Sequence, residues 1–194
     1  MSNVDELFAK SVRRYVVQLA KKGADDAHSL AHRPLTEQEI SEAERRLGFA
    51  LPSVLTTLYA RVANGGFGFA YGLLGLVGGA RQEDGNDAIT MYEQFRQRDP
   101  NDPHWQWPKK LLPVVHLGCA MFFCVDCSSD DGMVIWFEPN PHENNKPWDD
   151  AFFPLGRTFG DLMSGWTGGE STLDVMNSAF DAKLFSASSP ERDN

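Results

Sequence analysis

Residues 35–66 constrain the fold of this chain more than any other segment, because they carry the start and stop signals of short helices. Thr36 and Glu39 have the spacing of a capping box, in which each side chain satisfies a backbone N–H of the first helical turn. Gly48 can adopt the left-handed conformation that ends such a helix. The turn Asn64-Gly65-Gly66 stops a second helix. The segment therefore predicts two short helices followed by a glycine turn.

The second helix is expected to begin near Pro52, because proline is well placed in a first helical turn. Apolar side chains then recur at helical spacing along both helices, while the charged residues between them face water. The stripe of the first helix is Ile40, Ala43 and Leu47, and that of the second is Val54, Leu55, Leu58, Tyr59 and Val62. Both helices are expected to cover a core.

Helices are also predicted on either side of this segment. Residues 3–22 form an amphipathic pattern that ends before a polar connecting loop, residues 24–34. A short helix fits residues 89–98. Thr158 can cap a helix that ends at Gly168-Gly169. A last helix is expected from about residue 172 to 185, before a tail that is expected to be disordered. The apolar positions of the first helix and of the Thr158 helix are Val4, Leu7, Phe8, Tyr15, Val16 and Leu19, and Phe159, Leu162, Met163 and Trp166.

The residue pattern in the middle of the chain, from residue 67 to 137, is typical of strands. Phe67 to Val77 mixes aromatic residues with leucine and glycine, which suits a strand with bends or bulges. Three apolar runs separated by turn-forming residues follow at Leu112–Leu117, Met121–Val125 and Gly132–Phe137. Residues 138–151 are expected to form a loop. The prediction is a single α+β domain, with a twisted, mostly antiparallel sheet flanked by helices.

The predicted organisation has three parts: an N-terminal helix and linker over residues 1–34, a core over residues 35–170, and a C-terminal helix and tail over residues 171–194. No internal repeat is found in the sequence. The N-terminus lacks the pattern of a signal peptide, and no run reaches the ~20 apolar residues that cross a bilayer. We expect a cytoplasmic protein that does not bind membranes.

Charge limits the class of partner. The 18 Lys and Arg residues stand against 27 Asp and Glu residues, which gives a formal net charge of -9. A polyanion such as nucleic acid is repelled by this charge, whereas a basic protein is attracted. We therefore expect a protein partner and no direct binding of nucleic acid.

The sequence contains only incomplete versions of the motifs that are typical of catalysis or metal binding. Cys119, Cys124 and Cys127 match part of an iron–sulfur spacing, but the fourth cysteine is missing from the sequence. We interpret the three as reduced thiols. The sequence has no G-x-S-x-G motif and no P-loop lysine followed by serine or threonine, and His104 and His116 each stand alone. We expect no catalytic residue, no metal and no cofactor.

The order of residues in 35–68 resembles the signature of the SUKH superfamily. The matching positions are Glu44, Leu47, Gly48, Leu51, Pro52, Tyr59 and Asn64-Gly65-Gly66. Similar pieces follow at Leu112-Pro113-Val114, Gly118, Phe122 to Asp126, Val134-Ile135-Trp136 and Phe159 to Met163, so the resemblance spans about residues 35–166. Each matching residue also has a purely structural interpretation, so the motif marks the fold and not a binding site.

The resemblance implies a twisted sheet with flanking helices and a function in protein binding. Many bacterial members of this superfamily neutralise a toxin, and a fungal branch regulates cell-wall synthesis. The first hypothesis is an immunity protein that blocks a toxin domain, such as a nuclease, whose basic surface would attract an acidic inhibitor. The alternative is a housekeeping regulator or scaffold. The predicted contact residues are exposed acids and aromatic anchors: Glu83, Asp84, Asp87, Trp105, Trp107, Asp130, Asp131, Glu138, Trp148, Asp149 and Asp150.

Overall fold

The computed structural model describes residues 3–21, 30–143 and 146–187. The predicted helix pair is present as α2, Glu37–Leu47, and α3, Ser53–Arg61. The hydroxyl of Thr36 accepts the N–H of Glu39 and the Glu39 carboxylate accepts the N–H of Thr36, which completes the capping box. Gly48 ends α2 in the left-handed conformation, with φ of 80°. Local signals therefore define both helices.

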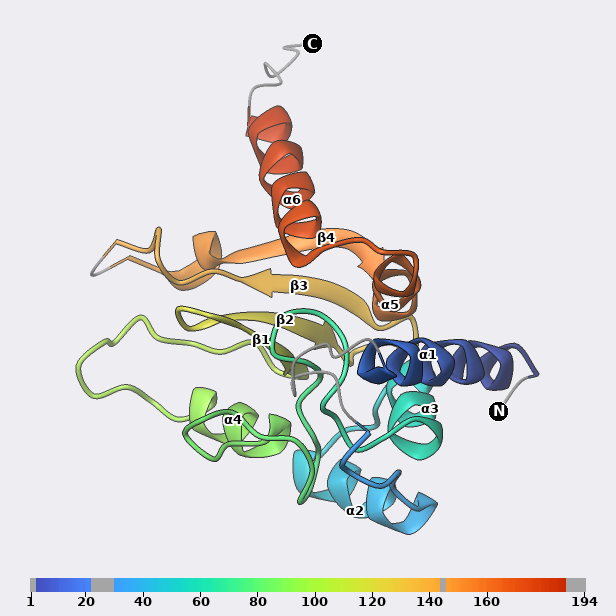
Figure 1. Cartoon of the computed structure of the whole chain (residues 1–194). Helices are drawn as coiled ribbons and strands as arrows, with labels where there is room; N and C mark the ends of the chain where they lie inside the picture. Colours follow the sequence, from blue (N-terminus) through green and yellow to red (C-terminus); the bar gives the residue numbers. More distant parts are fainter. Residues whose placement is uncertain (1–2, 22–29, 144–145, 188–194) are drawn as a thin grey trace.

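The sheet has four strands in the order β1-β2-β3-β4, and each neighbouring pair is antiparallel. The strands are β1, Leu111–Gly118; β2, Met121–Asp126; β3, Met133–Phe137; and β4, Phe152–Thr158. Figure 1 shows α2, α3 and α4 on the β1 side of the sheet, and α5 and α6 beside β4. The predicted α+β class with an antiparallel meander is confirmed.

Two expectations for the strands were wrong or incomplete. The segment Phe67–Val77 is not a strand, because its only ladder contact is the bridge between Leu73 and Val115. Positive φ angles at Gly68, Ala70 and Gly72 break the pleat and turn the backbone back on itself. The fourth strand, β4, was not predicted, because Pro154 and Gly156 interrupt its apolar pattern. It lies at the edge of the sheet, where a proline is tolerated.

The remaining helices confirm the predicted positions. They are α1, Asn3–Lys21; α4, Ala88–Phe95; α5, Phe159–Thr167; and α6, Thr172–Ala187, with the short 3-10 helix η2 at Trp148–Ala151. Thr158 and Asp161 form a second capping box at the start of α5. In Figure 1, α6 extends away from the sheet beyond β4. The predicted linker lies mainly outside the described residues, as does the C-terminal tail.

The N-terminal helix packs on the rest of the domain. Val12 and Val16 of α1 are fully buried, and Tyr15 meets Trp166 of α5 edge to face at 4.9 Å. The guanidinium of Arg13 donates to the carbonyl of Val62 at 3.0 Å, just after α3. Leu7 differs from the expected apolar stripe, because its side chain is 60% exposed. The buried face of α1 thus passes through Ala9, Val12 and Val16.

One continuous core joins helices and sheet. Trp136 and Phe123 contribute to it from the central strands, and Tyr59 contributes from α3. The hydroxyl of Tyr59 donates to the carbonyl of Leu74 at 2.7 Å, and full burial strongly raises its pKa. This contact connects α3 to residues 65–80, which lie between α3 and α4 and which we call the glycine-rich segment. That segment, in turn, forms one wall of the groove described below.

Candidate functional site

The strand registers separate the predicted contact residues between two ends of the sheet. Gly118 pairs with Met121 and Phe137 pairs with Phe152, so the turn 118–121 and the loop 138–151 share one end. We call this the loop end of the sheet. At the other end Leu111 pairs with Asp126, and the turn that follows β2 carries Asp130 and Asp131. These two acids therefore cannot belong to one compact contact surface with Trp148, Asp149 and Asp150.

Asp130 has a structural partner at its own end of the sheet. Its carboxylate accepts the backbone N–H of Ser53 at 2.6 Å, at the first residue of α3. An acid at a helix N-terminus is favoured by the helix dipole and by the unpaired N–H groups there. Asp131 is exposed beside it. We assign Asp130 to holding α3 against the β2–β3 turn.

Three of the predicted contact residues are buried and hold loops in place. Asp87 is 5% exposed and caps α4 by accepting the N–H and the hydroxyl of Thr90. Glu138 is 6% exposed and accepts the backbone N–H of Asn140 at 2.8 Å. Trp107 is 1% exposed, and its indole donates to the carbonyl of Leu111 at 2.7 Å. These side chains have little surface to offer to a partner.

The other two tryptophans of the prediction form a half-exposed aromatic cluster at the loop end. Trp105 and Trp148 meet edge to face, with ring centroids 4.9 Å apart. The indole of Trp105 donates to the carbonyl of Phe95 at 2.9 Å, and that of Trp148 donates to the Asp102 carboxylate at 2.7 Å. The Trp148 bond lowers the pKa of Asp102. Both rings are thus fixed in orientation before any partner binds.

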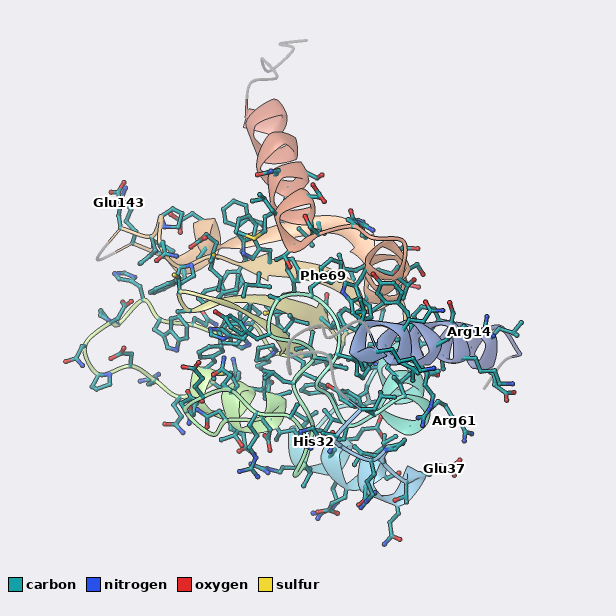
Figure 2. All side chains as sticks on the ribbon, in the orientation of Figure 1. Arg14, His32, Glu37, Arg61, Phe69 and Glu143 are labelled. Atoms are coloured by element: carbon teal, nitrogen blue, oxygen red, sulfur yellow. The ribbon has the colours of Figure 1, made fainter. Side chains whose placement is uncertain are left out.

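Acidic side chains surround this cluster. Asp149 and Asp150 are exposed in η2, and the Asp150 carboxylate lies 3.4 Å from Nδ1 of His142. The imidazole of His142 stacks on Trp148 with centroids 3.7 Å apart. Figure 2 shows Glu143 on the loop after β3, whereas Arg14 and Arg61 lie on α1 and α3 at the far side of the molecule. The loop end is therefore aromatic and carries several exposed acids, although the exposed side chains of Arg96 and Arg98 line a hollow with Trp105 there.

A groove of about 760 Å³ lies between the glycine-rich segment, α4 and the β1–β2 turn. Glu83 and Asp84 lie on its rim and are both exposed. Its aromatic wall is a stack of rings: Tyr71 lies over His116 at 5.4 Å, and His116 lies against Phe122 at 5.0 Å. The groove adjoins the loop end, because the side chain of Asn140 donates to the carbonyl of Cys119 at 3.5 Å.

The two buried thiols of the domain and the imidazole of His116 have shifted pKa values for simple physical reasons. Burial raises the pKa of Cys124, and it raises that of Cys127 to about 12, so both are neutral thiols. Partial burial lowers the pKa of His116, although the nearby carboxylates of Asp84 and Glu83 oppose that shift. Cys119 is exposed in the turn. Among the described residues, no group of three His, Cys, Asp or Glu side chains is placed to hold a metal ion.

Two features of the site have no signal in the sequence. Tyr71 and His116 stack although they are 45 positions apart in the chain, and the backbone contacts of Leu73 and Leu74 with β1 bring their segments together. Asp102, which orients Trp148, lies in an irregular loop with no motif. The acids Glu83 and Asp84 were recognised from composition, but their position beside an aromatic wall depends on tertiary structure.

The comparisons with known proteins concern the whole fold and not the groove alone. The model of the SMI1 / KNR4 family (SUKH-1) matches residues 34–165, which is more than half of the chain. A search of curated proteins finds no match. Within the described parts of the chain, no helix has the length and apolar character needed to cross a membrane.

Proposed function

Because the chain belongs to the SMI1 / KNR4 family (SUKH-1), we propose that it is a non-catalytic protein-binding domain that neutralises a toxin. The proposal places the protein in the cytoplasm, where it would meet a toxin that acts on intracellular targets. A toxin domain that cleaves nucleic acid presents a basic surface to its substrate, and an acidic inhibitor is steered toward that surface. The net charge of -9 fits such a partner.

The observation that carries this proposal is the gathering of exposed acids and oriented aromatic rings at one end of the sheet. Trp105 and Trp148 are fixed by hydrogen bonds, so little side-chain freedom is lost when a partner covers them. Asp149 and Asp150 flank the rings, and the groove with Glu83 and Asp84 adjoins them. Aromatic anchors with a charged rim are typical of protein interfaces.

Coexpression with the product of the neighbouring gene tests the proposal. We expect this product to arrest growth when it is expressed alone and to be harmless when the present chain is expressed with it. The purified pair should form a stoichiometric complex, which size-exclusion chromatography would detect. The contact surface is tested by the variant with Trp105 and Trp148 changed to alanine, which should fold but rescue poorly. A neighbour that is harmless alone, together with capture of resident regulatory enzymes, would favour the regulator that the fungal branch suggests.

A further inference from the structure

The groove beside α4 has an aromatic wall that reaches the surface. Phe122 is 2% exposed at its inner end, His116 is half-buried, and Tyr71 is 61% exposed at its outer end. The rings of Tyr71 and His116 are nearly parallel, with an interplanar angle of 23°. His116 covers one face of Tyr71, and the 61% exposure of the tyrosine leaves ring surface for a ligand. A tyrosine face of this kind attracts cations through its negative quadrupole.

Backbone contacts hold this wall in place. The N–H of Leu74 donates to the carbonyl of Val114 at 2.7 Å, so the glycine-rich segment is attached to β1. The ring of Tyr71 packs on the end of β1, where a Cβ added at Gly118 would make an ordinary van der Waals contact with it at 3.6 Å. Gly118 also has a φ of 92°, which other residues rarely adopt. The aromatic face is therefore preorganised.

The rim of the groove carries an excess of negative charge. Glu83 and Asp84 form no salt bridge within the described residues, whereas Arg81 supplies a single cation to the lining. The carboxylate of Asp84 is oriented by the backbone N–H and the side-chain amide of Asn86, both at 3.0 Å. Burial lowers the pKa of His116 in the ring wall, and the nearby carboxylates of Asp84 and Glu83 partly oppose that shift.

We propose that this groove is a binding pocket for an arginine side chain of the protein partner. The guanidinium would stack on the exposed ring surface of Tyr71 and pair with the carboxylates of Glu83 and Asp84. Arginine suits the pocket better than lysine, because its planar group can stack and form paired hydrogen bonds at once. An anionic occupant would meet two carboxylates and one arginine. The inference rests on the proposed function, since it takes the occupant from a protein partner.

The pocket can be tested before the partner is known, with Nα-acetyl-arginine methylamide as the probe. We expect NMR signals of Tyr71 and His116 to shift on titration, with saturation in the millimolar range that is typical of a single side chain. The bound cation should also lower the pH midpoint of the His116 ring, because it opposes protonation. The citrulline counterpart has nearly the same shape and no charge, and it should cause no saturable shift.

Two sets of variants decide whether the groove itself binds the probe. The double variant Glu83→Gln/Asp84→Asn should weaken probe binding by about 10-fold, because both charge-assisted contacts are lost. Tyr71→Phe should bind nearly as well as the original chain, whereas Tyr71→Leu should lose the stacking contribution. The control pair Glu37→Gln/Asp131→Asn removes the same charge far from the groove. Equal binding by the groove pair and the control pair would overturn the proposal, as would equal shifts by arginine and citrulline.

The outcomes separate this inference from the proposed function. A partner that binds the Tyr71→Leu and Glu83→Gln/Asp84→Asn variants as tightly as the original chain would overturn the arginine pocket and leave toxin binding intact. Specific binding of the arginine probe, without rescue from any neighbouring toxin, would support the pocket and count against immunity. Thermal melting of each variant shows that a loss of binding does not come from unfolding.

Discussion

At the scale of single residues, several charged side chains of this domain serve the backbone and are not available to a partner. Glu44 is the clearest case, because it stands in the family signature yet makes an internal contact. Its carboxylate accepts the backbone N–H of Leu51 at 2.8 Å, across the link between α2 and α3. Asp87 and Asp130 act in a similar way at the starts of α4 and α3. Only acids whose carboxylates do not hold the backbone in this way are available for contact with a partner.

Removal of the Glu44 carboxylate should destabilise the domain. Glu44→Ala leaves the half-buried N–H of Leu51 without its acceptor, and we expect a loss of about 1–2 kcal/mol in the free energy of unfolding, measured by urea denaturation. Glu42→Ala is the matched control on the same helix, because Glu42 forms only an exposed pair with Arg45. That change should cost less than about 0.5 kcal/mol. Similar losses in both variants would refute the structural role of Glu44.

The capping box of α2 should titrate at low pH. A hydrogen bond from Arg33, together with the N–H of Thr36, lowers the pKa of Glu39 from 4.5 to about 2. A lowered pKa in the folded state means that this contact stabilises the domain above pH 4.5 and is lost as the pH falls toward 2. We expect a carboxyl NMR midpoint near 2, and a higher midpoint in Arg33→Gln. A midpoint that stays the same in this variant would contradict the assigned cause.

At the scale of elements, the glycine-rich segment between α3 and α4 shapes the groove. Asn64 is 3% exposed and organises this segment, because its side-chain amide donates to the carbonyl of Val77 and accepts the N–H of Leu76. Gly79 packs directly on Asn64, where no side chain fits. The segment is therefore ordered by one buried amide and by close backbone packing, although it has no regular secondary structure.

Gly78 and Gly79 allow two reasons for requiring glycine to be tested separately, namely close packing and a positive φ angle. In Gly79→Ala the new methyl group would overlap the backbone oxygen and side chain of Asn64, and we expect a loss of about 2–3 kcal/mol in the free energy of unfolding. In Gly78→Ala the methyl group meets nothing within 4 Å, so only the positive φ of 64° costs energy, about 1 kcal/mol. Urea denaturation measures both. A larger loss in Gly78→Ala would show that close packing is not what requires glycine at position 79.

Elements with local signals could be predicted from the sequence, and those that depend on distant contacts could not. Caps and apolar stripes fall within a few residues of each other, so α2, α3 and α5 were predicted correctly. The strand β4 was missed because its pairing with β3 outweighs the unfavourable Pro154 and Gly156. Among the predicted contact residues, composition identified the acids but could not show that Asp87 and Glu138 are buried. That distinction needs tertiary structure.

At the scale of the whole molecule, charged side chains are distributed unevenly over the surface of the domain. The loop end and the groove carry exposed acids and fixed aromatic rings, whereas Arg14 on α1 and Arg61 on α3 lie on the far side (Figure 2). A surface of this polarity orients a basic partner as it approaches, in addition to attracting it. We therefore expect the affinity for a basic partner to depend more on the position of the acids than on their total number.

The most direct measurement compares two charge reversals in the complex with the neighbouring toxin domain. Glu83→Lys/Asp84→Lys and Glu37→Lys/Asp131→Lys change the net charge equally, but only the first pair lies on the groove. Calorimetry at physiological salt should show affinity weakened by at least about 10-fold for the groove pair and by less than about 3-fold for the control pair. Rescue of growth should fail only for the groove pair. Equal weakening by both pairs, or tight binding by the groove pair, would contradict the account.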